Sequence, residues 1–178
     1  MKTVHLMILI GLYSSCKASL KIVEQPTRYS TVVEGESFQG VIFSEDTECT
    51  YCFQGEKRFS PTLYNVQEAE EVLKDNLRQE NAEKVNQGKN CPVIHKNLNN
   101  YRRQYFGYIN QKGDSIIYTI FEWSRYSISD RIRGAIEDNS EDWKKEMVLD
   151  LDGCSRYWTI NIDITEEKLF NLRVNGVG

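Results

Sequence analysis

The residues from Arg156 to Ile164 alternate strictly between two kinds of side chain. One set is apolar or aromatic: Trp158, Ile160, Ile162 and Ile164. The other set carries polar groups: Tyr157, Thr159, Asn161 and Asp163. A period of two places successive side chains on opposite faces of a β-strand. One apolar face and one polar face indicate an antiparallel sheet that is covered on a single side.

Four further segments have strand character. Arg103 to Ile109 and Ser115 to Trp123 flank Asn110-Gln111-Lys112-Gly113, which predicts a hairpin with a four-residue loop. Lys145 to Leu151 precedes the alternating strand, and Lys168 to Val174 follows it. The sequence therefore predicts five consecutive antiparallel strands in the second half of the chain.

A helix is predicted before these strands. Ser60-Pro61-Thr62 offers a capping hydroxyl and a proline suited to a first helical turn. Apolar residues then recur at spacings of three and four: Val66, Ala69, Val72, Leu73 and Leu77. Asn86-Gln87-Gly88 provides an end, because glycine adopts a left-handed cap easily. One apolar stripe on this helix is the simplest cover for the apolar face of the sheet.

The expected fold class is α+β, with one long helix packed on a five-strand antiparallel meander. This order of elements resembles the cystatin-like or NTF2-like arrangement, which is a likeness of topology alone. Residues 61–178 would form this domain. Residues 16–60 are expected to form an N-terminal arm with short strands, within Ile22 to Val33 and Phe38 to Phe43.

Residues 1–15 are interpreted as a signal peptide. Lys2 supplies a positive charge, and Val4 to Leu12 is an apolar run too short to span a bilayer. Leu12-Tyr13-Ser14-Ser15-Cys16 resembles a bacterial lipobox, which implies cleavage before Cys16 and lipid attachment at that cysteine. The alternative is ordinary cleavage after Ala18.

Four cysteines remain if Cys16 carries lipid: Cys49, Cys52, Cys91 and Cys154. In an exported protein an even number favours disulfides, and four cysteines allow three connectivities. A zinc site that includes His95 is the weaker alternative, because the second pair lacks the close spacing of zinc ligands. We therefore expect possible disulfides and no metal or other cofactor.

The charge of the chain argues against some partners. Without Lys2 the 22 basic residues become 21 against 26 acidic ones, so the exported chain is mildly acidic. That balance gives no electrostatic footprint for nucleic acid. Catalytic motifs are also missing from the sequence, since there is no G-x-S-x-G and His95 is the only histidine after cleavage.

Aromatic residues in the predicted sheet suggest a binding surface. Four rings are candidates for the face away from the helix: Tyr105, Tyr118, Trp123 and Tyr157. Exposed rings on such a face would suit a peptide or a glycan.

Several short motifs resemble an uncharacterised family of small Bacteroidetes lipoproteins. They are Phe59 to Thr62, Asn90 to Ile94 with Asn97-Leu98, Tyr101 to Asn110, Asp152-Gly153, Tyr157-Trp158 and Val174 to Gly176. The resemblance covers about the last two thirds of the chain and implies export and fold, with no assigned activity. Cys154 departs from the family pattern, which has a second glycine there.

These observations together predict a noncatalytic lipoprotein of the bacterial cell envelope. The expected location is the outer membrane, through the N-terminal lipid, with a secreted or periplasmic protein as the alternative. The expected partner is a protein, a peptide or a glycan. The alternative function is a small exported hydrolase or thiol redox enzyme that uses the cysteines or carboxylates of the sheet.

Overall fold

The computed structural model describes residues 20–48, 53, 55–88, 90–125, 141–150 and 152–177. The predicted signal segment, the lipid site Cys16 and the cysteines Cys49 and Cys52 lie outside these residues.

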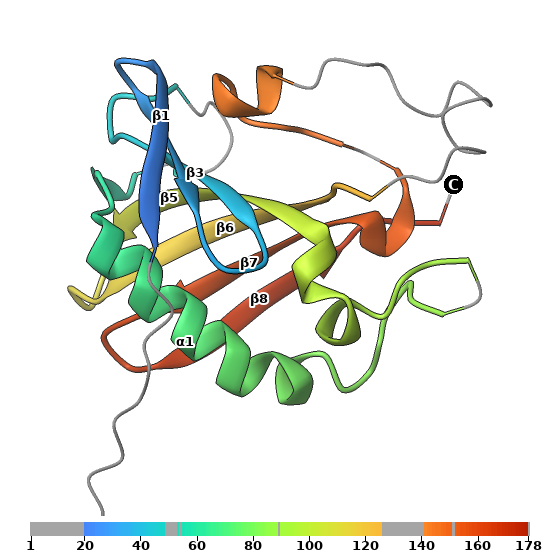
Figure 1. The fold of residues 1–178 in the computed structure, drawn as a ribbon. Coiled ribbons are helices and arrows are strands. Elements are labelled where there is room, and N and C mark those ends of the chain that lie inside the picture. Colours follow the sequence, from blue (N-terminus) through green and yellow to red (C-terminus); the bar gives the residue numbers. More distant parts are fainter. Residues whose placement is uncertain are drawn as a thin grey trace, which may run out of the picture.

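The described chain forms one sheet of eight strands and one long helix (Figure 1). Seven strands follow one another across the sheet in the order β1-β2-β3-β5-β6-β7-β8. Their bounds are β1 Lys21–Thr27, β2 Ser30–Glu34, β3 Gln39–Phe43, β5 Tyr101–Ile109, β6 Ser115–Trp123, β7 Tyr157–Asp163 and β8 Lys168–Val174. The eighth strand, β4 (Lys57–Phe59), pairs with β5.

The sheet is mixed because β3 and β4 pair with the same edge of β5 in opposite directions. β3 runs parallel to the first half of β5, where Gly40 is opposite Arg103. β4 runs antiparallel to the second half, where Phe59 is opposite Gly107. The prediction of a five-strand antiparallel meander with a cystatin-like or NTF2-like arrangement was therefore wrong. The prediction treated residues 16–60 as a separate arm, whereas β3 in this region pairs with β5, about 60 residues further along the chain.

The helix α1 spans Leu63–Glu80 and begins as predicted. The Thr62 hydroxyl accepts a hydrogen bond from the Asn65 backbone N–H, and the Asn65 side chain accepts one from the Thr62 N–H. The end was predicted too late, at Asn86 to Gly88. The helix stops at Asn81, and Lys84 and Asn86 both have positive φ angles that no α-helix contains.

The face of the sheet beneath α1 holds the larger apolar core. The buried helix residues Val66, Ala69, Val72, Leu73 and Leu77 were all in the predicted stripe. They pack against a layer that includes Ile117, Phe121, Trp158, Ile160 and Ile162. The apolar face of the alternating strand is therefore confirmed as the helix side, with Phe121 stacked on Trp158 at a ring distance of 3.7 Å.

The opposite face of the sheet is also covered, which corrects the prediction of a single covered side. A second apolar cluster there contains Val41, Phe43, Phe106, Ile120 and Tyr157. Its cover includes residues 141–150, which were expected to provide a strand over Lys145 to Leu151. They form instead a short 3-10 helix, η3 (Asp142–Lys144), followed by extended backbone outside the sheet.

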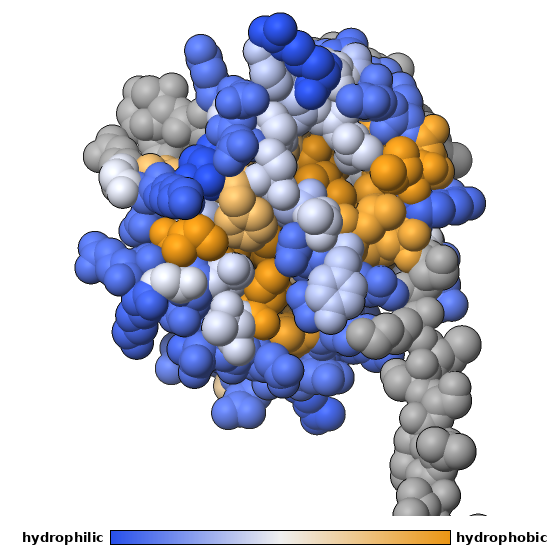
Figure 2. Space-filling model, turned by 90° about the vertical axis from the view of Figure 1, so that its left-hand side faces the viewer, coloured by the Kyte–Doolittle hydropathy of each residue, from blue (hydrophilic) through white to orange (hydrophobic). Residues whose placement is uncertain are grey.

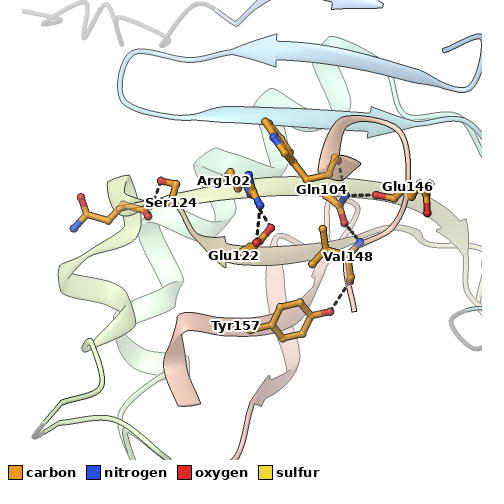
Figure 3. Close-up of polar contacts among 9 residues, drawn as sticks. Arg102, Gln104, Glu122, Ser124, Glu146, Val148 and Tyr157 are labelled. Carbon is orange, nitrogen blue, oxygen red and sulfur yellow. Dashed lines mark hydrogen bonds and ion pairs between the residues drawn. The ribbon is translucent and has the colours of Figure 1, made fainter. Parts of the chain in front are cut away.

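Side chains of the sheet bind the main chain of this segment, as Figure 3 shows. The Gln104 amide nitrogen donates to the carbonyl oxygens of Trp143 and Glu146, both at 2.7 Å. The Gln104 carbonyl oxygen accepts from the Val148 N–H at 2.8 Å, and the Tyr157 hydroxyl donates to the Val148 carbonyl at 3.0 Å. These bonds satisfy four main-chain groups of the segment without a strand partner.

A disulfide closes the other end of the molecule. Cys91 pairs with Cys154 and ties the connection between α1 and β5 to the start of β7. The connection also contains two 3-10 helices, η1 (Ile94–Lys96) and η2 (Leu98–Asn100). A third, η4 (Cys154–Arg156), leads into β7.

Apolar side chains are not confined to the two clusters. Figure 2 shows several separate apolar areas among polar side chains on the face that it presents. Among the described parts of the chain, no helix is both long enough and apolar enough to cross a bilayer.

Candidate functional site

A cleft of about 490 Å³ lies where four parts of the fold meet. The turn between β2 and β3, Glu34 to Gln39, forms one wall. The start of β5, the end of β6 and η3 form the rest, and they contribute Tyr101, Arg102, Ser124 and Lys144 among others. We refer to this feature as the cleft.

Arg102 is the central charged group of the cleft. Its guanidinium holds the Glu122 carboxylate with two hydrogen bonds, of 2.7 Å from Nε and 2.6 Å from Nη2 (Figure 3). The same guanidinium lies 5.0 Å from the centre of the Trp143 ring. The two-pronged pair and the ring contact together fix the planar group in one orientation.

Lys144 forms a second paired charge at the border of the cleft. Its ammonium group lies 2.7 Å from Glu141 and 2.8 Å from Glu24. The hydrogen bonds that Lys144 donates to Glu141 and Glu24 raise the pKa of Lys144 above its usual value. Because Glu24 belongs to β1, this pair links the edge of the sheet to η3.

A buried network of charged residues lies beneath the turn that forms one wall of the cleft. Phe38, in the β2–β3 turn, lies over the Arg103 guanidinium at 3.7 Å. Arg103 is almost fully buried and forms an ion pair of 3.0 Å with Glu70 of α1. The Tyr105 hydroxyl donates to the same carboxylate at 2.8 Å, and burial raises the pKa of Tyr105 well above its usual value. The turn that forms the wall is thus connected to the helix through Arg103.

The four predicted rings do not lie together. Tyr105 is fully buried on the helix side, where Trp123 also packs and its indole N–H donates to the Arg125 carbonyl. Tyr118 and Tyr157 belong to the cluster on the opposite face, and Tyr157 is only 6% exposed. No single surface presents all four rings.

The other predicted chemistry is also distributed over the fold. The Cys91–Cys154 disulfide selects one pairing for two of the four cysteines. His95 lies in η1, where Asn81 contacts its Nδ1 at 2.9 Å. Among the residues that the structure describes, no group of three or more His, Cys, Asp and Glu side chains is placed to hold a metal ion.

Among the sheet carboxylates, the sequence suggested that Glu122 could meet Asp150 or Asp163 across strands, and the structure places Glu122 and Asp163 apart. Glu122 is bound to Arg102, whereas Asp163 accepts from the N–H groups of Thr165 and Glu166 in the β7–β8 turn. Asp163 is opposite Ile116, six residues from Glu122 on β6, which places the two groups about 20 Å apart. Glu122 and Asp163 therefore do not share a catalytic centre. Asp150, the other carboxylate that the sequence offered as a partner for Glu122, accepts a hydrogen bond from the Asp152 N–H.

Sequence reasoning missed the residues of the cleft. Arg102 and Glu122 are a cross-strand pair only in the observed register, in which five residues separate β5 from β6, whereas the predicted four-residue loop would place Arg102 opposite Phe121. Trp143 and Lys144 gave no comparable signal, since only the folded chain brings η3 onto the sheet.

The cleft combines paired ionic groups with polar side chains and main-chain groups, an arrangement suited to holding a polar ligand. No protein-family model, curated protein or solved structure matches the chain.

Proposed function

We propose that this protein is a noncatalytic, exported lipoprotein of the bacterial cell envelope that binds a segment of another protein in the cleft. Export and lipid attachment rest on the signal-like residues 1–15 and on Cys16. The lipid at Cys16 would anchor the domain to the outer membrane, in keeping with the resemblance to small Bacteroidetes lipoproteins.

The observation that carries the binding site is the pairing of charges at the cleft. Arg102 is paired with Glu122, and Lys144 is held between the two carboxylates of Glu24 and Glu141. A fixed pair of charges presents oriented donors and acceptors without a strong net field. Such a surface favours a polar, uncharged or charge-balanced ligand such as a peptide main chain.

A peptide fits the cleft better than a glycan does. Glycan sites commonly offer the open face of an aromatic ring, but Trp143 is only 5% exposed and is contacted by Arg102. Tyr101 is 1% exposed. Trp143 and Tyr101 therefore form part of the floor of the cleft rather than a platform for sugar rings.

The binding proposal is tested with a displayed library of random peptides and with a glycan microarray. We expect the library to yield peptides that bind the wild-type protein. Ser37→Arg, at an exposed position of the turn, should reduce their affinity at least tenfold because the long side chain enters the cleft. The matched control is Asp75→Asn on the exposed side of α1, which should bind as the wild type does.

Two outcomes contradict this assignment. Equal binding by Ser37→Arg and wild type would remove the cleft as the site. Binding on the glycan array alone would overturn the choice of a peptide.

Lipid attachment has its own test. The intact mass of the native protein should correspond to cleavage before Cys16 plus acyl chains, and Cys16→Ser should release the protein from the membrane fraction. A Cys16→Ser variant that stays in the membrane fraction would contradict the anchor.

A further inference from the structure

A closed network of side chains joins the end of α1 to η1, away from the cleft. It consists of Asn81, Gln87 and His95. Asn81 is 2% exposed, although its side chain is polar. Each hydrogen-bonding hydrogen of the two amide groups has a partner, which allows the proton on the imidazole to be placed by geometry.

Gln87 is the fixed point of the network. Its carbonyl oxygen accepts from the Ile94 backbone N–H at 2.9 Å, and its amide nitrogen donates to the Val85 carbonyl at 3.2 Å. Exchanging the oxygen and the nitrogen would place a donor against a donor and an acceptor against an acceptor. The main chain therefore sets the orientation of Gln87.

Gln87 in turn sets the orientation of Asn81. The Gln87 amide nitrogen donates to the Asn81 carbonyl oxygen at 2.6 Å, and the Asn81 amide nitrogen donates back at 2.9 Å. The second hydrogen of that nitrogen points to His95, whose Nδ1 is 2.9 Å away. Nδ1 must accept this bond, so the neutral imidazole carries its proton on Nε2.

Protonation cannot be accommodated by this network. A proton on Nδ1 would face the Asn81 N–H group, and turning the Asn81 amide would break its reciprocal pair with Gln87. Turning Gln87 as well would sacrifice its bonds to Ile94 and Val85. We propose that His95 is a pH-operated latch, whose protonation separates η1 from the end of α1.

The charges around His95 act in the same direction. Burial first, and then Lys84, Arg78 and Lys96, lower the pKa of His95 below its usual value. These cations belong to the connection, to α1 and to η1, while the carboxyl end of α1 opposes them by favouring a positive charge. A folded pKa below the unfolded one means that the latch contributes stability above about pH 6.5, which is lost as the pH falls.

The released segment is short because two features limit it. The Cys91–Cys154 disulfide holds one side of η1 to β7. On the other side, the Asn100 carbonyl accepts from the backbone N–H and the hydroxyl of Ser124, both at 2.9 Å. Opening is therefore expected between Cys91 and Asn100, around η1, whether or not the cleft binds a ligand.

Nitrogen NMR of the imidazole tests the first step directly. In the full chain carrying His5→Gln, His95 is the only histidine, and at pH 8 its spectrum should show the Nε2–H tautomer. The Nδ1–H tautomer would overturn the proposal without any change to the fold.

Hydrogen exchange tests the second step. The protection of the Ile94 amide, corrected for intrinsic exchange, should fall roughly three- to tenfold between pH 7.5 and pH 5, the factor of one net hydrogen bond. His95→Gln should remove this pH dependence because its side chain does not titrate. A pH dependence that persists in His95→Gln would contradict the latch.

Asn81→Asp provides the matched reversal. A carboxylate at this position accepts from protonated His95, so it should move the imidazole titration to higher pH than in the wild type. The loss of hydrogen-exchange protection at the Ile94 amide on acidification should become smaller or change to a gain. An imidazole titration that is unchanged or lower in this variant would show that Asn81 does not control His95.

Discussion

The ion pair between Arg103 and Glu70 places a charged guanidinium in the interior of the fold. A charge withdrawn from water costs several kcal/mol unless a partner and hydrogen bonds replace the solvent. Here Glu70 supplies the charge, Tyr101 and Leu98 supply carbonyl acceptors for the guanidinium, and Phe38 covers its face. The network thus buries a cation where the turn, the sheet and the helix meet.

Glu70→Gln removes the charge and keeps the shape of the side chain. We expect the free energy of unfolding to fall by about 3–5 kcal/mol, because Arg103 remains buried without a counter-charge. Urea unfolding followed by circular dichroism measures the change. Asp75→Asn on the exposed side of α1 is the control and should stay within about 0.5 kcal/mol of the wild type. A loss below about 1 kcal/mol for Glu70→Gln would show that water reaches the guanidinium.

At the scale of helices and strands, the sequence predicted an element well where an apolar pattern repeats along it. The stripe of α1 and the alternation of β7 identified the helix side of the core, and the Asn110 to Gly113 loop identified the β5–β6 hairpin. β5, β6, β7 and β8 were all predicted as strands, with ends within two residues of those observed.

The elements that were missed depend on contacts distant in sequence. β4 has three residues, and it is stabilised by pairing with β5 and by contacts of Arg58 and Phe59 with distant parts of the chain. Residues 145–150 have strand-like composition, but the side chains of Gln104 and Tyr157, rather than a neighbouring strand, bind the main chain there. The cleft could not be predicted for the same reason, because its turn and η3 meet β5 and β6 only in the folded sheet.

The α1–β5 connection depends on its disulfide. Cys91→Ala with Cys154→Ala should lower the free energy of unfolding by about 2–5 kcal/mol, because the cross-link restricts the unfolded chain across a separation of 63 residues. Denaturant unfolding of wild type and variant without reductant measures the loss. Adding reductant should bring the wild type close to the variant. A wild type that keeps its full stability under reducing conditions would contradict this role.

At the scale of the whole molecule, both faces of the sheet bury tyrosines. Tyr101 and Tyr105 lie on the helix side, and Tyr118 and Tyr157 lie on the other. Burial raises the pKa of each of them, and it raises the pKa of Tyr108 to about 12. The folded chain therefore holds these protons more tightly than the unfolded chain does.

This difference predicts alkaline instability. A folded pKa above the unfolded value contributes stability that is complete below about pH 10 and is lost as the pH rises further. We expect the urea midpoint to fall steadily between pH 10 and pH 12, while absorbance at 295 nm shows that part of the tyrosinate appears only on unfolding. A midpoint that stays constant over this range would contradict the tight burial of these hydroxyl groups.

The shared edge of β5 also determines the order in which the chain can be assembled. The strands β1, β2 and β3 are synthesised first, yet β3 finds its neighbour only after another 60 or so residues have followed. Pairing over such a separation is slow, and an unpaired strand edge attracts other chains in the meantime. Until β5 is available, the free edge of the three-strand meander β1–β2–β3 can therefore associate with other chains, and a chaperone bound to that edge would protect it.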